Sequence, residues 1–283
     1  MKQIVVISGK GGTGKTMLTG ALAALIPNKV VADCDVDAAN LHLLLHPSVK
    51  EVHSFKSGAA ARIDPLLCTR CGRCVEVCRF GAVREGFEID PIACEGCGLC
   101  AHVCPVKAIS MEECTAGEWY VSKTRYGPFV HAKLGIAEEN SGKLVAKVRQ
   151  VAKEIAEEKK ADYVIIDGPP GIGCPVIASL TGVDLVVVVT EPTLSGLHDA
   201  ERVIELAEHF NVPVRMVINK WDINPEAAAK IRALCESRKI PVIGSIPFDR
   251  TITESVIAGN TASEHAQGAL RDRFAAIWEA VKG

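Results

Sequence analysis

Six short runs rich in valine and isoleucine recur along the chain, and segments with apolar residues at helical spacing separate them. The runs lie at Gln3–Ser8, Lys29–Ala32, Tyr163–Ile166, Leu185–Thr190, Val214–Ile218 and Val242–Ile246. Continuous apolar strands of this kind belong to parallel sheets that helices cover on both faces. The pattern therefore predicts an α/β fold with a mostly parallel, doubly wound sheet.

Helical spacing marks several of the connecting segments. Met17–Ile26 follows the first strand, and Lys143–Lys159 precedes the third. Near the C-terminus an i, i+3, i+4, i+7 stripe is formed by Phe274, Ile277, Trp278 and Val281. The polar face of this last segment mixes both signs of charge and lacks the basic excess of membrane-surface helices. We therefore expect it to pack against the sheet.

The segment SGKGGTGKT, residues 8–16, joins the first strand to the first helix and fits the phosphate-loop pattern G-x-x-x-x-G-K-[ST]. Its glycines let backbone N–H groups curl around a phosphate, and the helix directs its positive dipole end at the same anion. Lys15 would reach the β- and γ-phosphates, and the Thr16 hydroxyl would ligate Mg²⁺. Lys10 has no role in this pattern. The residues expected to contact the nucleotide are Gly11, Gly12, Thr13, Gly14, Lys15, Thr16 and Met17.

Acidic residues follow two of the predicted strands at the sheet edge where ligands bind. Asp167 ends the strand Tyr163–Ile166, and the second strand leads into Asp33, Asp35 and Asp37. Carboxylates at the carboxyl ends of parallel strands can hold Mg²⁺ through its water ligands. The alternative for each of the three residues after the second strand is a solvated carboxylate in a turn.

Composition narrows the classes of protein. The chain has 283 residues, 48% of them hydrophobic, and a formal net charge of −2. This nearly neutral net charge does not favour electrostatic binding of nucleic acid or anionic lipid. With no leader pattern and no membrane-spanning apolar run, we expect a cytoplasmic protein that binds neither nucleic acid nor membrane. In that compartment its twelve cysteines favour metal or redox chemistry over disulfides.

Eight of the twelve cysteines form the pattern C-x2-C-x2-C-x3-C twice, with the second copy 26 residues after the first (Cys68 to Cys94). This is the spacing of a bacterial two-cluster ferredoxin, in which three cysteines of each run hold one 4Fe-4S cluster and the fourth ligates the other. The expected ligands are Cys68, Cys71, Cys74 and Cys104 for one cluster, and Cys94, Cys97, Cys100 and Cys78 for the second.

Zinc is the alternative occupant, but tetrahedral zinc sites use paired C-x2-C motifs and leave the third and fourth cysteines of each run without a role. The two runs differ in one respect, because Pro105 follows the last cysteine of the second run and Arg79 follows that of the first. The cysteine block interrupts the α/β pattern. We therefore predict an inserted ferredoxin-like α+β domain at 60–112 within a discontinuous phosphate-loop ATPase domain at 1–59 and 113–283.

Taken together, the motifs resemble the MinD/ParA family of deviant phosphate-loop ATPases, in the branch with an inserted two-cluster ferredoxin domain. The resemblance covers essentially the whole chain. The motifs that carry it are KGGTGKT at 10–16, DCDVDAANL at 33–41, DYVIIDGPPG at 162–171, TEPTLSGLHDA at 190–200, VINK at 217–220 and GSIPFD at 244–249.

The resemblance implies a sandwich dimer in which Lys10 reaches the nucleotide of the partner subunit. It also assigns Asp35 to the attacking water and Asp167 to Mg²⁺ through water. Asn219, Lys220 and Pro247 are expected at the base. The base itself stays open between ATP and GTP, because NKWD at 219–222 also fits the guanine-reading pattern N-K-x-D.

Three classes of function remain. The hypothesis we favour is an ATPase with two permanent 4Fe-4S clusters that couples nucleotide state to electron transfer, or to assembly of a metal cofactor on a partner protein. The second is a cluster carrier of the Mrp type, for which the chain offers only the lone Cys34 and Cys174. The third is a positioning ATPase. Expected partners are a second copy or a related ATPase, and an unidentified redox protein or metalloprotein.

Overall fold

The computed structural model describes residues 1–135 and 141–282, which form two compact units. The first unit contains Met1–His53, Trp119–Lys133 and the chain from Ser141 onward. The second contains Ser54–Glu118, with Leu134 and Gly135 assigned to it as well. The cysteine-rich unit thus extends beyond the insertion expected at 60–112 at both ends. Within the described ranges, no helix is both long and apolar enough to cross a bilayer.

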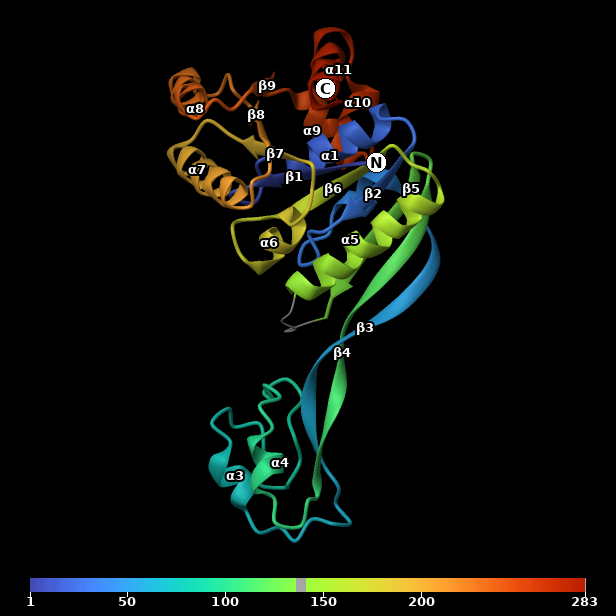
Figure 1. Ribbon diagram of the computed structural model, residues 1–283, viewed down its shortest axis with the longest axis vertical. Helices are drawn as coiled ribbons and strands as arrows, with labels where there is room; N and C mark the ends of the chain where they lie inside the picture. Colours follow the sequence, from blue (N-terminus) through green and yellow to red (C-terminus); the bar gives the residue numbers. More distant parts are fainter. Residues whose placement is uncertain (136–140, 283) are drawn as a thin grey trace. The chain divides into compact units, whose positions relative to one another are not determined.

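All six predicted strands are present in a nine-stranded sheet with the order β3-β4-β5-β2-β6-β1-β7-β8-β9. Each run of valine and isoleucine pairs in parallel with its neighbours. The prediction of an α/β fold with a mostly parallel sheet is therefore confirmed (Figure 1). The six strands are β1 (Lys2–Ser8), β2 (Lys29–Asp33), β6 (Tyr163–Pro170), β7 (Leu185–Thr190), β8 (Val214–Asn219) and β9 (Val242–Ile246).

Three further strands complete the sheet, namely β3 (Ser48–Ile63), β4 (Ile109–Thr124) and β5 (Gly127–Leu134). The two-residue turn Arg125–Tyr126 joins β4 to β5, so these two strands run antiparallel, whereas β5 pairs with β2 in parallel. Strands β3 and β4 contribute residues to both units. Most of β3 is exposed, so its sequence lacks the apolar run by which the other strands were recognised.

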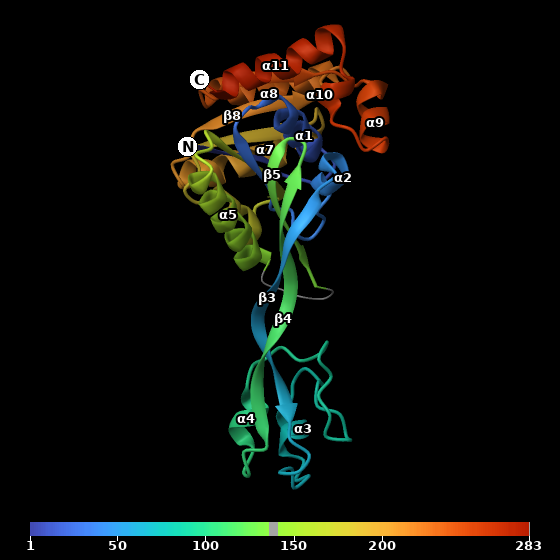
Figure 2. The ribbon, with the colours of Figure 1, turned by 90° about the vertical axis from the view of Figure 1, so that its right-hand side faces the viewer.

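Helices cover both faces of the sheet. Helices α1 (Lys15–Leu25) and α11 (Gly268–Lys282) pack on one face, while α5 (Ser141–Glu158), α6 (Cys174–Leu180) and α7 (Leu194–His209) pack on the other, as the two views show (Figures 1 and 2). The remaining helices of this unit are α2 (Leu41–Leu45), α8 (Pro225–Ser237), α9 (Arg250–Ile257) and α10 (Ala262–His265).

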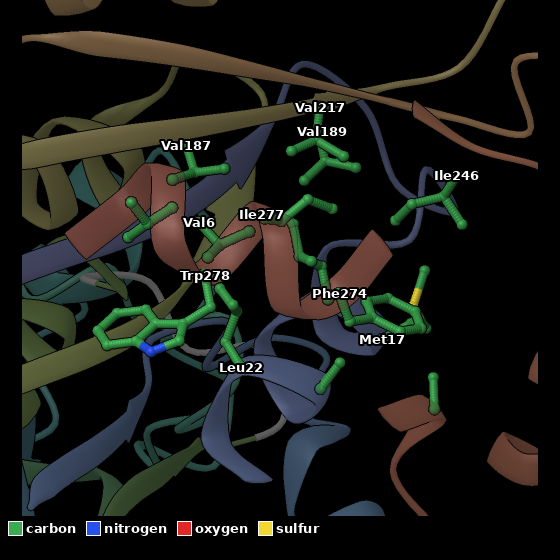
Figure 3. Close-up of a cluster of buried hydrophobic side chains, with 14 of the residues drawn as sticks. Val6, Met17, Leu22, Val187, Val189, Val217, Ile246, Phe274, Ile277 and Trp278 are labelled. Atoms are coloured by element: carbon green, nitrogen blue, oxygen red, sulfur yellow. The ribbon is translucent and has the colours of Figure 1, made fainter. Parts of the chain in front are cut away.

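The C-terminal stripe lies in the main hydrophobic core (Figure 3). Phe274 and Val281 are fully buried, and Ile277 and Trp278 expose 1% and 8% of their surface. Together they pack with Met17 and Leu22 of α1 and with one face of the central strands. The expectation that this helix packs against the sheet is therefore confirmed, and its apolar face belongs to the core.

The second unit carries the two cysteine runs in equivalent local structures. Helices α3 (Arg73–Val77) and α4 (Leu99–Val103) each begin after a glycine with left-handed backbone, Gly72 at φ 81° and Gly98 at φ 74°. Glycine is the residue that adopts this conformation without strain. The two helices pack against each other over a small core that includes Cys74 and Cys100. The internal repeat of the sequence is thus also a structural repeat.

Candidate functional site

The phosphate loop spans Gly9–Gly14, between β1 and α1. Gly12 and Gly14 take left-handed backbone, with φ of 80° and 100°. A Cβ on Gly14 would collide with the side-chain amide of Asn219, which donates a hydrogen bond to the Thr13 carbonyl at 2.8 Å. The loop therefore needs glycine here, and Asn219 at the end of β8 fixes its shape.

A cavity of about 470 Å³ opens at this loop. The Thr13 hydroxyl is buried and has no hydrogen-bond partner among the residues that the structure describes, so it can donate to a ligand at this point of the loop. The N-terminus of α1 faces the same cavity and favours an anion there. These features fit a nucleotide phosphate. The cavity is lined by residues 11–17 and by Asp35, Ala38, Asn40, Leu43, Leu44, Pro170 and Val256.

Lys15 and Asp35 form a buried ion pair at one wall of this cavity. The Lys15 Nζ lies 3.1 Å from Asp35 Oδ2, and the lysine exposes 7% of its surface. Desolvation lowers the pKa of Lys15, but the carboxylates of Asp167 and Asp35 outweigh it, so that the pKa is raised overall. The lysine is therefore a fixed cation at neutral pH.

Two threonine hydroxyls of α1 donate hydrogen bonds to the Asp167 carboxylate. Thr16 donates to Oδ2 at 2.7 Å, and Thr19 donates to Oδ1 at 2.9 Å. Burial raises the pKa of Asp167 above its usual value, although Lys15 and the two hydroxyls oppose the rise. Because β2 and β6 pair Asp33 with Asp167 in register, the carboxylates that follow the two strands meet at one sheet edge. Thr16 and Asp167 together offer the oxygen ligands that Mg²⁺ prefers.

The three aspartates after β2 have different environments. Asp33 is fully buried and accepts the backbone N–H groups of Asp35 at 3.1 Å and Leu41 at 3.2 Å, so it shapes the turn that carries Asp35. Burial, followed by the charge of Asp167, raises the pKa of Asp33 well above its usual range. Asp37 is exposed. Asp35 is the one that lines the cavity.

The side chain of Lys10 turns toward its own chain. Its Nζ lies 2.7 Å from Glu191 Oε1, and it donates hydrogen bonds to the hydroxyls of Ser195 at 3.0 Å and Thr193 at 3.3 Å. Burial raises the pKa of Glu191, but Lys10 and Lys220 outweigh it and the pKa is lowered overall. All three residues that contact Lys10 lie in the motif TEPTLSG at 190–196. The sequence alone gave no reason to expect that they hold this lysine.

The residues expected at the base lie outside the cavity, since none of Asn219, Lys220 and Pro247 lines it. Asn219 is buried and holds the phosphate loop. Lys220 lies 3.5 Å from Glu191. At the end of the NKWD motif, Asp222 Oδ1 accepts the backbone N–H of Phe248 at 2.7 Å. Both polar ends of this motif are thus engaged within the chain.

Two small cavities in the second unit are each lined by four cysteines, three from one run and the fourth from the other. We call them the first pocket, with Cys68, Cys71, Cys74 and Cys104, and the second pocket, with Cys78, Cys94, Cys97 and Cys100. Within the described part of the chain, no three His, Cys, Asp or Glu side chains are grouped closely enough to hold a single metal ion. A cuboidal cluster places irons and sulfides between its thiolates, so it spaces its cysteines more widely than one ion does.

Backbone N–H groups point at several of these sulfurs. Cys68 Sγ accepts from Arg70 at 3.4 Å, Cys104 Sγ from Ala108 at 3.3 Å and Cys94 Sγ from Ala61 at 3.5 Å. Desolvation raises the pKa of the Cys78 thiol, but the N–H groups of residues 80–83 more than offset it, so the pKa is lowered overall. Such donors favour thiolates, which are the metal-ligating form of cysteine.

The two cysteines near the nucleotide edge are unlike each other. Cys34 is fully buried, and burial raises its pKa strongly. Its thiol therefore stays protonated and is not accessible to another protein. Cys174 is exposed at the start of α6. Neither lines the phosphate-loop cavity or a cysteine pocket.

Comparison with known proteins places this site in a family. Residues 4–262 match the family described as the CobQ/CobB/MinD/ParA nucleotide binding domain. The chain belongs to this family. Among its relatives, the uncharacterized protein MJ0578 of Methanocaldococcus jannaschii is 39% identical over 225 residues, which are 78% of this chain and 79% of that protein. The septum site-determining protein MinD of Synechocystis is 27% identical over 267 residues, covering 90% of this chain and 79% of MinD.

Solved structures of this family share the fold. MinD of Pyrococcus horikoshii complexed with Mg-ADP aligns with a TM-score of 0.60 at 19% identity, over 99% of this chain and 95% of that one. MinD in the MinC:MinD complex of Aquifex aeolicus aligns with a TM-score of 0.62 at 19% identity, over 100% and 96% of the two chains. At this level of identity the likeness shows the fold alone.

Proposed function

We propose that this MinD/ParA-type protein binds and hydrolyses ATP and carries two permanent 4Fe-4S clusters. In this proposal its nucleotide state controls electron transfer to a partner protein, or assembly of a metal cofactor there. The observation that carries the proposal is the presence, in one chain, of a phosphate-loop cavity and of two pockets with four cysteines each.

At the nucleotide cavity, the loop N–H groups and Thr13 would hold the phosphates, while Thr16 and Asp167 would hold Mg²⁺ directly and through water. A bound Mg²⁺ and the Lys15 ammonium would neutralise charge that develops on the γ-phosphoryl group. Lys15 is paired with Asp35 at 3.1 Å. An entering phosphate would compete for Lys15 and free the Asp35 carboxylate, which could then orient the attacking water.

Two side chains of the NKWD motif contact neighbouring loops. Asp222 Oδ1 accepts the Phe248 N–H, and Asn219 donates to the Thr13 carbonyl of the phosphate loop. We favour ATP over GTP because of the MinD/ParA relationship, in which MinD of Pyrococcus horikoshii is complexed with Mg-ADP.

The cysteine pockets suit clusters better than zinc. Each pocket takes its fourth cysteine from the other run, as the ferredoxin pattern requires. When bound, the clusters would accept and donate single electrons at low potential. The chain's own contribution is to supply thiolates and to shield Cys74 and Cys100 in its small core.

One preparation tests both halves of the proposal. Protein purified without oxygen is analysed for iron, acid-labile sulfide and zinc, and its ATP turnover is compared with that of Lys15→Ala. We expect about eight irons per chain and turnover that Lys15→Ala abolishes. Zinc in place of iron would overturn the redox half, and equal turnover in the two proteins would overturn the ATPase half.

A positioning ATPase is the second candidate, and the likeness to septum site-determining proteins favours it. The apolar stripe of α11 is buried in the core and so is not available to a membrane. Co-sedimentation with anionic vesicles, with and without Mg-ATP, separates the two candidates. Binding that requires Mg-ATP would favour the positioning function, and we expect none.

A further inference from the structure

The two cysteine pockets occupy equivalent places in the structural repeat, so their surroundings can be compared position by position. Because the fourth cysteine of each run lies in the other pocket, the loop after Cys104 borders the first pocket, and the loop after Cys78 borders the second. An offset of 26 residues, Cys68 to Cys94, relates the equivalent positions. Differences between these positions distinguish the two pockets.

Charge is the main difference. The first pocket has Arg70, Arg73 and Lys107 at the positions where the second has Gly96, Leu99 and Gly81. It also has the neutral Thr69 where the second has Glu95, whereas the second has one cation, Arg79, where the first has Pro105. We call Arg70, Arg73 and Lys107 the basic rim.

All three residues of the basic rim are exposed. Arg73 lines the pocket, the Arg70 N–H donates to Cys68 Sγ, and the Lys107 N–H donates to the Cys104 carbonyl. Two acidic residues lie near this rim. One is Asp64, which recurs as Asp90 in the repeat, and the other is Glu76, which lines neither pocket.

Exposed apolar side chains accompany the basic rim. Leu66 exposes 93% of its surface, Leu67 54% and Val106 41%, and Val106 lines the first pocket. Exposed apolar side chains next to a group of cations suit a transient docking surface, in which charge steers the encounter and apolar contact holds it. The second pocket also has exposed apolar side chains, Phe80, Ile92 and Leu99, but it lacks the three cations of the basic rim.

We propose that the mouth of the first pocket, together with the basic rim, docks an acidic electron-carrier protein. This inference rests on the proposed function, because the cluster held by Cys68, Cys71, Cys74 and Cys104 must be present. In the transfer step a reduced carrier loses one electron and this cluster gains it, or the reverse, and no bond or proton moves. The same cations stabilise the added electron, so this cluster has the higher reduction potential of the two.

A matched pair of substitutions tests the inference. Arg73→Gln removes one charge from the basic rim, and Arg79→Gln removes one charge from the loop beside the second pocket. The probe is an acidic plant-type 2Fe-2S ferredoxin, mixed with the protein by stopped flow at several salt concentrations. The electron moves in whichever direction the measured potentials favour.

We expect Arg73→Gln to lower the second-order rate about three- to tenfold at low salt and to flatten its salt dependence, while Arg79→Gln changes the rate by less than about twofold. In EPR-monitored redox titrations, Arg73→Gln should lower the potential of one cluster only. Arg70→Gly, which installs the residue found at the equivalent position 96, should act in the same direction. It is compatible with the left-handed backbone of Arg70, at φ 55°.

The outcomes separate this inference from the proposed function. Full iron content with equal effects of Arg73→Gln and Arg79→Gln, or a rate independent of salt, would overturn the docking face alone. Protein without iron would overturn the proposed function and this inference with it. Iron content of each variant also reports whether its second unit has assembled.

Discussion

At the scale of single residues, Lys10 is held in a resting position by contacts that are weak enough to break. Its ion pair with Glu191 is partly exposed, with 29% and 19% of the two side chains accessible. Such pairs contribute about 0–1 kcal/mol. Competition from a nucleotide phosphate on a partner subunit could therefore release the lysine at little cost, as the expected role of Lys10 across a dimer requires.

Lys10→Ala is predicted to keep nucleotide binding and to lose nucleotide-dependent dimerisation and turnover. Lys15 and the loop N–H groups remain to bind the phosphates, whereas a cation brought to the γ-phosphoryl oxygens is lost, and turnover should fall about a hundredfold or more. Calorimetry, light scattering and phosphate release measure the three properties, with Lys153→Ala as the matched control. Unchanged turnover would mean that Lys10 is only a loop residue.

His131 should make stability depend on pH in a defined window. Its ring stacks with those of Phe129 and Tyr120, whose centroids are 4.7 and 4.8 Å away, and burial, followed by His42, lowers its pKa to about 4. The unfolded chain, with a pKa near 6.5, then binds more protons than the folded one between these values. Stability is fully present above about pH 6.5 and falls by up to about 3 kcal/mol as the pH drops to about 4.

Urea unfolding at pH 7.5 and pH 5 measures this effect. His131→Gln should lose less stability between the two pH values than the wild-type protein, while the exposed His198→Gln should behave like the wild type. Equal losses for His131→Gln and the wild-type protein would show that the imidazole does not carry this part of the pH dependence.

At the scale of elements, the two cysteine pockets predict how much cluster iron each cysteine variant retains. Cys74 lines the first pocket and Cys34 lines neither pocket. Cys74→Ser should therefore lose about half of the cluster iron, and Cys34→Ser should lose none, by iron analysis of protein purified without oxygen. Loss of iron from Cys34→Ser would instead place a further metal site beside the nucleotide.

The elements differ in how far the sequence predicts them. The central strands were predicted because burial on both faces requires continuous valine and isoleucine, as in Val186–Val189 of β7. Strands β3 and β4 have long exposed stretches, so their side chains need not follow an apolar pattern and neither strand was predicted. The stripe of α11 was recognised because it lies on one buried face.

The candidate site shows the same division. The phosphate loop and Asp167 could be predicted because local chemistry fixes them, in a glycine-rich turn and at a strand end. The contact of Lys10 with Glu191 depends on a fold that brings together residues 181 positions apart (191 minus 10), and no local pattern reveals it. The role of Asn219 in holding the Thr13 carbonyl likewise arises only from the packing of β8 beside the loop.

At the scale of the whole molecule, one chain contains a phosphate-loop cavity and two four-cysteine pockets. The nucleotide cavity belongs to the first unit and both cysteine pockets to the second. Strands β3 and β4 carry the chain between the units, and β3 follows the segment 35–45 that borders the nucleotide cavity. Asp35, which we expect to change its contacts on nucleotide binding, is thus close in sequence to the strand that enters the cysteine-rich unit.

We propose above that nucleotide state and redox state are coupled. Low-temperature EPR of the dithionite-reduced protein, with iron analysis, tests this coupling in three samples: without nucleotide, with Mg-ADP and with a non-hydrolysable ATP analogue. We expect two interacting 4Fe-4S signals whose line shape or potential changes only with the ATP analogue. Signals that are the same in all three samples would contradict it.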